Sequence, residues 1–277
     1  MLGMMQNDNY LGWKKPGIAM ITGATAGLGL CFAGHLAQKG FDLVLAARRR
    51  DRLDSIAANI TAQYGVRCET IFADLANMEE IRKTADYVKQ IENLDILINN
   101  AGFATIGAFA EVPLEKTMQM FHLHMASSVL LAHAALPAML KKKRGAIINL
   151  SSIAAFTLTP GNVMYDATKS FLVTFSENLQ LEVRNAGIRV QALCPGFTRT
   201  EFHEVGDFKN FDRSVVPNTL WMTADKVVSL SLKALKKNKN VVFIPGWKNR
   251  LLTWLITHSK SLQSIAQNRV KERDLQI

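Results

Sequence analysis

Cysteine is scarce in this sequence. Only Cys31, Cys68 and Cys194 occur among 277 residues, an odd number, far apart and without a CxxC pair. Such a set is typical of reduced thiols in the cytoplasm rather than of a disulfide framework. The stretch from Met1 to Lys15 lacks the apolar core and small-residue site of a secretory signal. We therefore expect a cytoplasmic protein with free thiols.

Long apolar runs, glycine and proline are also limited. No uncharged apolar stretch reaches the roughly 18 residues that a membrane-spanning helix needs, so none is expected. With 17 glycines and 7 prolines, the chain is neither collagen-like nor rich in linkers. Since 48% of the residues are hydrophobic and 20% are charged, disorder is excluded. A chain of 30.7 kDa buries about three quarters of its unfolded surface, which indicates one large domain or at most two small ones.

Acidic residues are outnumbered by basic ones. The chain has 33 Lys and Arg against 23 Asp and Glu, a formal charge of +10. The basic residues form short groups at Arg48–Arg52, Lys141–Arg144 and Lys233–Lys239, and aromatic residues are not interleaved with them. A nucleic-acid site needs basic residues on one continuous face. We expect no nucleic-acid partner, but a solvated surface that attracts anionic ligands.

Short apolar runs alternate with helical patterns along the chain. The apolar runs suit strands that are covered on both faces. The predicted strands are Ile18–Thr22, Asp42–Ala46, Cys68–Phe72, Leu94–Ile98, Ala146–Leu150, Ile188–Leu193 and Val241–Ile244. The predicted helices are roughly Leu28–Lys39, Arg52–Tyr64, Met78–Ile91, Thr117–Lys143, Met164–Asn185 and Ala224–Lys237.

This alternation predicts an α/β fold. Successive β and α units imply right-handed crossovers and a parallel sheet between helices. We expect a doubly wound (Rossmann) seven-stranded sheet with helices on both faces, in a single domain of residues 16–246. An N-terminal arm of residues 1–15 and a C-terminal extension of residues 247–277 flank this domain.

A glycine-rich loop, Thr22 to Gly29, lies between the first predicted strand and helix. Glycines allow a tight turn and a close approach of the backbone to a pyrophosphate, and the helix N-terminus supplies free N–H groups. Three glycines at this place in the first βα unit are a much stronger signal than a glycine pattern alone. The candidate cofactor-binding residues here are Gly23, Thr25, Ala26, Gly27, Leu28 and Gly29.

Three arginines follow the second predicted strand. An acidic residue at this point would bind the ribose 2′-hydroxyl of NAD, whereas arginine favours the 2′-phosphate of NADP. Arg48 is the first candidate for this contact and Arg49 the second. We therefore predict NADP(H) in preference to NAD(H).

Tyr165 and Lys169 are four residues apart in a predicted helix, so they share one face. A free tyrosine titrates near pH 10, and a neighbouring ammonium group would lower that value enough for proton exchange. Ser152 follows a predicted strand and lies at the carboxyl edge of the sheet, where α/β enzymes bind ligands. These three residues are the candidate catalytic group.

Taken in order, these motifs resemble those of the short-chain dehydrogenase/reductase family over about residues 16–246. The glycine loop, Ala73-Asp74-Leu75, Asn99-Asn100-Ala101-Gly102, Ser152, Tyr165-x-x-x-Lys169 and Pro195-Gly196-Phe197-Thr198-Arg199-Thr200 carry the resemblance. It implies that Asp74 contacts the adenine and that Asn100 and Ala101 line the cofactor groove. The further cofactor-binding residues that it implies are Leu75, Gly102, Pro195, Gly196, Thr198 and Thr200, with Tyr165 and Lys169.

The resemblance also implies a mechanism. Hydride passes between nicotinamide C4 and a carbonyl carbon, Tyr165 protonates the alkoxide and Ser152 binds the substrate oxygen. Lys169 lowers the pKa of the tyrosine and binds the ribose hydroxyls. His124 stands where the family usually has an Asn that completes a tetrad, so it either replaces that relay or merely packs. His122 and His124 are two apart on a helix and point to different faces, so no metal site is expected.

Two segments remain open to several interpretations. The loop after Gly196 carries apolar residues that suit a hydrophobic ketone or acyl substrate, although about half of them would simply pack: Phe202, Phe208, Phe211, Val215, Val216, Trp221 and Met222. The extension has apolar and basic residues at near-helical spacing: Leu251, Leu252, Leu255, Ile256, Leu262, Ile265, Ala266, Lys248, Arg250, Lys260 and Arg269. Packing on the domain or between subunits is preferred over contact with a membrane surface.

The sequence thus predicts an NADPH-dependent carbonyl reductase, or the reverse alcohol dehydrogenase, acting on a small-molecule substrate. A cofactor-binding sensor or scaffold without turnover is the alternative, because His124 breaks the tetrad. A nucleotide-sugar epimerase or dehydratase shares Tyr-x-x-x-Lys, but those relatives usually have a different glycine spacing and a longer substrate domain. Family members are commonly homodimers or homotetramers through the helices Thr117–Lys143 and Met164–Asn185.

Overall fold

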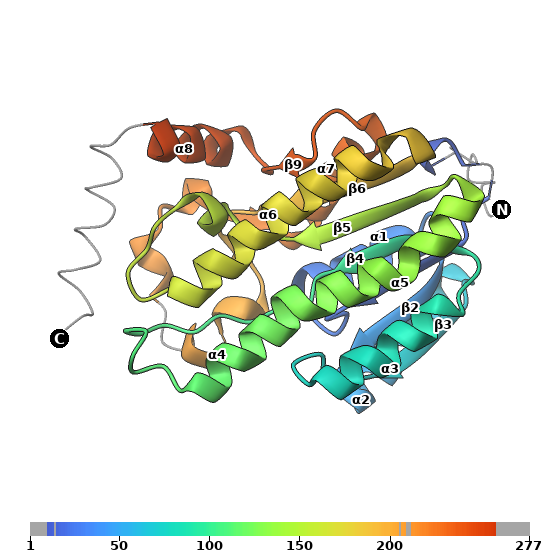
Figure 1. The fold of residues 1–277 in the computed structure, drawn as a ribbon, viewed down its shortest axis with the longest axis horizontal. Coiled ribbons are helices and arrows are strands. Elements are labelled where there is room, and N and C mark those ends of the chain that lie inside the picture. The colour runs from blue at the N-terminus through green and yellow to red at the C-terminus, as the bar shows by residue number, and fades with distance from the viewer. Residues whose placement is uncertain (1–9, 14, 205, 209–211, 259–277) are drawn as a thin grey trace.

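The computed structural model describes residues 10–13, 15–204, 206–208 and 212–258 (Figure 1). Seven parallel strands form its main sheet in the order β3-β2-β1-β4-β5-β6-β9. They are β1 (Ile18–Thr22), β2 (Asp42–Ala47), β3 (Cys68–Phe72), β4 (Leu94–Asn99), β5 (Gly145–Leu150), β6 (Ile188–Leu193) and β9 (Val242–Phe243). The predicted fold class and all seven predicted strands are confirmed.

Helices cover both faces of this sheet. They are α1 (Gly27–Ala37), α2 (Arg50–Tyr64), α3 (Met78–Lys89), α4 (Leu114–Phe121), α5 (Ser127–Lys142), α6 (Val163–Val183), α7 (Ala224–Lys237) and α8 (Trp247–His258). In Figure 1, α5 and α6 cross in front of the sheet and α1 lies behind it. Each face has its own core, because neighbouring residues of a strand point to opposite sides. Ile21 of β1 packs with Phe32 of α1, whereas Met20 packs in the cluster that contains Leu131 of α5.

Leu114–Lys142 is one long helical segment in which α4 and α5 are joined by a π-helical turn, η2 (His122–Ala126). An 18-residue window of it has a mean hydropathy of 1.5, so by length and composition it could cross a membrane. The expectation that no segment is long and apolar enough for a membrane-spanning helix is therefore wrong by length and composition. Half of this window is buried inside the domain, and Leu131, Ala135 and Met139 are fully enclosed. Buried core helices pass the same test, and packing against the sheet accounts for the apolar character of this one.

The C-terminal extension begins with α8, which packs beside the short helix η3 (Ile153–Phe156). Asn249 and Thr253 of α8 are buried, whereas Trp247 and Trp254 are more than half exposed. This part of the extension therefore packs on the domain with one side only. The predicted apolar positions Leu262, Ile265 and Ala266, and the basic Lys260 and Arg269, lie outside the described residues.

Candidate active site

The predicted site residues gather at the carboxyl edge of the sheet. The glycine loop follows β1, Asn100 follows β4, Ser152 follows β5 and Pro195 follows β6. In Figure 1 the arrow of β5 points toward this end of the molecule. Because all these strands are parallel, their carboxyl ends meet there, and segments far apart in the sequence come to face one another.

The glycine loop is too crowded for side chains at two of its positions. A Cβ on Gly29 would lie 2.3 Å from the carbonyl oxygen of Gly23, and a Cβ on Gly23 would lie 2.8 Å from Asn100 Nδ2. Gly23 also has a φ of +66°, a left-handed conformation that favours glycine. The N-cap of α1 is Ala26, and no side chain caps this helix end. The backbone N–H groups of the first turn, from Gly27 onward, are thus left for an anion.

Asn100 and Ala101 fasten the end of β4 to the end of β1. Their backbone N–H groups donate to Thr22 Oγ1, at 2.9 and 3.0 Å. Asn100 Nδ2 donates to the carbonyl oxygen of Thr22 at 2.8 Å. Gly102 comes next, and a Cβ there would lie 2.8 Å from His124 Nε2. Asn100 therefore fixes the start of the glycine loop by hydrogen bonds to Thr22.

The arginines after β2 take different partners. Arg49 donates to Thr25 Oγ1 of the glycine loop through Nε and Nη2, at 3.2 and 3.0 Å. Its Nη1 donates to the Glu201 carboxylate at 3.2 Å, and Arg52 also pairs with Glu201. Arg48 is 65% exposed, and its nearest ion pair is with Asp74 at 3.9 Å. The sequence analysis missed Glu201 and Arg52. Their sequence neighbours give no sign that these two residues pair beside the glycine loop.

Asp74 follows β3 in a tight turn. Its Oδ1 accepts a hydrogen bond from the backbone N–H of Ala76 at 3.1 Å. The backbone N–H of Asp74 donates to Glu80 Oε2 at 3.1 Å. Leu75 is buried beside it. The turn holds the Asp74 carboxylate, about half exposed, near the arginines that follow the neighbouring strand.

Ser152, Tyr165 and Lys169 come together as the sequence predicts. Ser152 is the N-cap of η3, and its Oγ accepts a hydrogen bond from Ala154 N–H at 3.1 Å. The Ser152 hydroxyl lies near enough to Tyr165 to lower the pKa of that phenol. Lys169 Nζ lies 5.5 Å from the centre of the Tyr165 ring and donates to the carbonyl oxygen of Leu150 at 2.8 Å. The three side chains thus form one group at the end of β5.

The electrostatics of this group differ from the expectation. Burial raises the pKa of Tyr165 to about 12, the hydrogen bond from Ser152 opposes this, and the Asp166 carboxylate adds to it. Burial also lowers the pKa of Lys169 to about 7. The expected lowering of the Tyr165 pKa by an ammonium group at Lys169 is not seen in this structure, because desolvation dominates at both groups.

Asp166 itself lies under the loop that precedes α6. It is 8% exposed, and its Oδ2 accepts a hydrogen bond from Thr159 N–H at 3.0 Å. Burial raises the pKa of this carboxyl to about 6, against the hydrogen bonds from Thr159. The sequence analysis did not single out this residue, although it is next to Tyr165.

His124 is buried and held through both ring nitrogens. Nε2 accepts a hydrogen bond from Phe103 N–H at 3.2 Å, so it carries a lone pair. Nδ1 lies 2.9 Å from Thr168 Oγ1, whose hydroxyl donates to the Tyr165 carbonyl oxygen, so Nδ1 carries the proton. Burial, and then the charge of Lys169, hold the pKa of His124 well below its usual range. The neutral ring thus connects Phe103 to α6 through hydrogen bonds. Of the two roles considered for His124, this arrangement favours packing over a relay that changes its protonation state.

The segment after β6 closes over the glycine loop. Thr198 Oγ1 donates to the Gly196 carbonyl oxygen at 2.9 Å, and a Cβ on Gly27 would lie 3.1 Å from Thr200 Cβ. Pro195 accepts a hydrogen bond from Ile153 N–H at 3.1 Å. Beneath Gly196 lies the buried Asn249 of α8, 2.8 Å from where a Cβ would stand. Asn249 was missed, since an asparagine in an apolar extension carries no signal of its own.

The loop toward α7 supplies aromatic side chains to this site. The Phe202 ring lies 6.2 Å from the Tyr165 ring. Trp221 packs on Phe197 at 5.3 Å and on His203 at 5.1 Å, and it is buried, as is Val216. Part of the loop therefore packs on the body and part faces the tyrosine. Phe211 and the side chain of Phe208 lie outside the described residues.

Comparisons with known proteins agree with this geometry. A profile of the short chain dehydrogenase family matches residues 17–207. The very-long-chain 3-oxoacyl-CoA reductase of Anas platyrhynchos is 33% identical over 216 residues, 76% of this chain and 69% of the relative. The inactive hydroxysteroid dehydrogenase-like protein 1 of Homo sapiens is 30% identical over 202 residues, 72% of this chain, and the matched part spans 61% of that relative.

A similar arrangement is found among solved structures. A short-chain dehydrogenase from Sphingobium yanoikuyae in complex with NADPH has a TM-score of 0.78 and 31% identity to this chain. The match covers 95% of this chain and 97% of that one. The likeness therefore extends over nearly the whole of both chains.

Proposed function

This chain belongs to the short-chain dehydrogenase/reductase family, and on that premise we propose that it interconverts a carbonyl and an alcohol with NADP(H). One observation carries the proposal. Ser152, Tyr165 and Lys169 meet at the end of β5, beside a glycine loop that leads into a helix without a side-chain cap. A proton donor and an anion cradle at one sheet edge are what a nicotinamide-dependent oxidoreductase requires.

The residues at the carboxyl edge fit a nicotinamide dinucleotide. Glycines stand where a Cβ would collide with the backbone, and the first turn of α1 has unpaired N–H groups for a pyrophosphate. The glycine loop, from Gly23 to Gly29, would hold the pyrophosphate and Asp74 the adenine. Thr198 and Thr200 would hold the nicotinamide amide. The bound cofactor supplies or accepts the hydride.

Each residue of the catalytic group then has a role. With a pKa of about 12, the Tyr165 hydroxyl stays protonated at neutral pH, which suits donation of a proton to a developing alkoxide. Ser152 would orient the substrate oxygen toward that hydroxyl. Lys169, against the Tyr165 ring, would bind the ribose hydroxyls.

Positive charge beside the glycine loop supports the preference for NADP(H). The Arg49 guanidinium lies on Thr25, where a 2′-phosphate would approach the loop, and Arg52 is next to it. Guanidinium groups bind phosphates through paired hydrogen bonds. The Glu201 carboxylate between Arg49 and Arg52 indicates that this position accepts an anion.

Aromatic side chains around Tyr165 support an apolar substrate. The Phe202 ring is next to the Tyr165 ring, and His203 connects Phe202 to the packed rings of Phe197 and Trp221. The 3-oxoacyl-CoA reductase among the relatives acts on an acyl substrate by its name. We propose a hydrophobic ketone or a 3-oxoacyl thioester for this chain.

Replacing the proton donor tests the activity. With a panel of apolar ketones and 3-oxoacyl thioesters, Tyr165→Phe should lower NADPH oxidation about 100- to 1,000-fold, because the alkoxide loses its proton source. The dissociation constant for NADPH, measured by fluorescence, should change by less than about threefold. Tyr87→Phe is the control, since that hydroxyl is bonded to Glu69, away from the site. NADPH binding by the wild type with no Tyr165-dependent turnover would reject catalysis.

That outcome would favour the alternative, a cofactor-binding sensor or scaffold without turnover. Two observations keep this alternative in view. One relative is named inactive, and the family's usual tetrad asparagine is replaced by a neutral, fully engaged His124.

Removing single arginines tests the cofactor preference. Arg49→Ala should weaken NADPH about tenfold and NADH less than about twofold, because only NADPH carries the 2′-phosphate. Arg48→Ala should have a smaller effect, since that side chain is directed to Asp74. Arg67→Ala, which breaks an exposed pair with Asp42, is the control. Equal losses for both cofactors in Arg49→Ala would show that the 2′-phosphate is bound elsewhere.

We also propose a homodimer or homotetramer formed through α5 and α6. Exposed apolar side chains on these helices support it: Val129, Leu140, Val163 and Leu181. Light scattering on the purified chain gives the assembly mass directly.

A further inference from the structure

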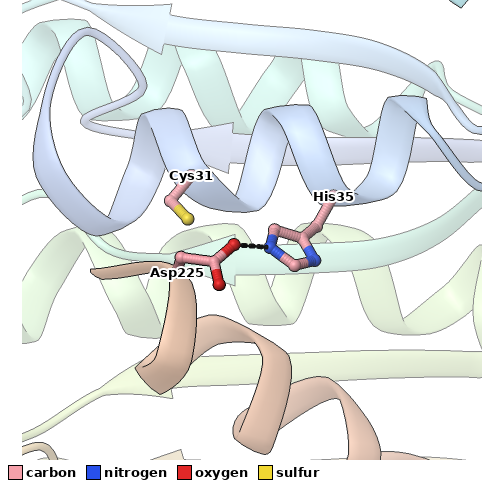
Figure 2. A group of neighbouring side chains, drawn as sticks. All are labelled: Cys31, His35 and Asp225. Carbon is pink, nitrogen blue, oxygen red and sulfur yellow. Dashed lines mark hydrogen bonds and ion pairs between the residues drawn. The ribbon is translucent and has the colours of Figure 1, made fainter. Parts of the chain in front are cut away.

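A cysteine, a histidine and an aspartate meet where α1 packs against α7, away from the catalytic group. Cys31 and His35 project from α1, and Asp225 is in the first turn of α7 (Figure 2). Asp225 is 190 residues from His35 in the sequence. Spacing along the chain therefore gives no sign of this group, and the expectation of no metal site did not take it into account.

The geometry of the group is compact. Three ligand atoms lie within 4.8 Å of one another: the Cys31 sulfur, a His35 ring nitrogen and an Asp225 carboxylate oxygen. His35 Nε2 and Asp225 Oδ1 are 2.8 Å apart, and Figure 2 shows the Cys31 side chain directed to the same carboxylate. Cys31 and His35 are four residues apart, so α1 holds both on one face.

The chemistry of these three donors is that of a zinc site. Zn²⁺ takes thiolate, imidazole and carboxylate ligands, and sites with three protein ligands complete the tetrahedron with water. Mg²⁺ and Ca²⁺ prefer all-oxygen sites, so the sulfur and nitrogen donors argue against them. Tetrahedral zinc places its ligand atoms about 3.3–3.6 Å apart. Separations of up to 4.8 Å must therefore shorten by about 1 Å, and the 2.8 Å between His35 Nε2 and Asp225 Oδ1 must lengthen. The Asp225 side chain is 76% exposed and has room to turn.

We propose that Cys31, His35 and Asp225 bind one Zn²⁺ ion between α1 and α7. Binding replaces the thiol proton of Cys31, which leaves to solvent, by the metal. The imidazole donates its lone pair and the carboxylate binds as an anion. Water fills the fourth position, because no fourth side chain from the described residues belongs to the group.

The site lies between two helices that each lead to a part of the proposed cofactor site. α1 begins at the glycine loop, and α7 begins directly after β8 (Met222–Thr223). β8 pairs with β7 (Thr198–Arg199), which carries the predicted nicotinamide contact Thr198. A bound ion would therefore link the helix of the pyrophosphate site to the segment of the nicotinamide site. This inference does not depend on the proposed activity.

Cobalt substitution tests the site on the full-length chain without a histidine tag. The reduced, chelator-stripped protein is titrated with Co²⁺, and we expect one equivalent to produce a near-ultraviolet thiolate-to-cobalt absorption that Zn²⁺ then abolishes. A hundredfold excess of free Zn²⁺ over its dissociation constant should raise the melting temperature by roughly 5 °C.

Matched variants separate this site from a plain ion pair. Cys31→Ser keeps the His35–Asp225 pair but should lose the thiolate absorption, and His35→Gln should weaken Co²⁺ binding at least about tenfold. Cys68→Ser, a second half-buried thiol on β3, should bind as the wild type does. The proposal is overturned if the wild type gives no thiolate absorption. It is equally overturned if Cys31→Ser retains that absorption, or if Cys68→Ser loses it.

Discussion

Both ends of the sheet bury a charged group, and they treat it in opposite ways. At the amino end, Asp95 is 1% exposed and fully partnered: Lys142 Nζ lies 2.9 Å away, Arg144 pairs with it, and Gly17 N–H donates to it at 2.7 Å. At the carboxyl end, Lys169 is 4% exposed and donates to the backbone carbonyl oxygen of Leu150. Among the described residues, no carboxylate forms an ion pair with it.

The difference separates stability from chemistry. A buried ion is tolerated when partners replace its hydration, which is the arrangement around Asp95. An amine without a counter-ion responds by losing its proton more easily, and burial lowers the pKa of Lys169 to about 7. Perturbed groups of this kind concentrate at functional sites. The amino end therefore holds a paired buried ion, whereas the carboxyl end holds an amine whose pKa is lowered by burial.

The largest expected change is a loss of folding stability when the buried Asp95 at the amino end of the sheet is replaced. Asp95→Asn leaves Lys142 and Arg144 without their carboxylate, so the free energy of unfolding should fall by about 3 kcal/mol. Turnover per folded molecule should not change. Urea unfolding followed by circular dichroism measures the loss. Asp86→Asn breaks an exposed pair with Lys89 and should cost less than about 1 kcal/mol, so equal losses in the two variants would contradict the comparison.

The second effect concerns the two lysines. Lys169→Met should lower turnover roughly 100-fold, equal to about 2.7 kcal/mol, but should not destabilise the chain at pH 7, because it removes a buried amine whose charged form is disfavoured by burial. Lys142→Met should do the reverse, because that lysine neutralises Asp95. Initial rates and urea unfolding of both variants give the contrast. The distinction between the two ends fails if Lys169→Met unfolds as easily as Lys142→Met.

The smallest effect is in the pH dependence of stability. Lys169 has a pKa of about 7 in the folded chain, against about 10.4 when unfolded. Between these values the unfolded chain binds more protons, so the stability of the wild type should rise with pH. Relative to Lys169→Met, the gain from pH 7 to pH 9 should be about 2 kcal/mol. Parallel profiles for the two proteins would show that this amine keeps an ordinary pKa.

Much of the fold could be predicted because its signals are local. The apolar runs at β1, β4 and β5 are buried by helices on both faces, and the structure places all seven predicted strands within a few residues of their expected bounds. Ser152, Tyr165 and Lys169 could be grouped because helix spacing and the ends of parallel strands fix their relative positions.

Residues whose role depends on a distant partner could not be found in this way. Glu201 meets Arg49 and Arg52 across about 150 positions, and Asn249 fits beneath Gly196 only after α8 has packed. Their own sequence neighbourhoods resemble an ordinary loop and an ordinary apolar extension.

The order of residues by itself determined the doubly wound sheet, the glycine loop and the grouping of the candidate catalytic residues. These depend on periodicity, turn chemistry and motif spacing, which act over short stretches of chain. Only the tertiary structure decided the burial that shifts the pKa values of Tyr165 and Lys169, the hydrogen bonds of His124 and the meeting of Cys31 with Asp225. Those properties depend on how far water is excluded and on which distant groups replace it, and both are set when the elements pack.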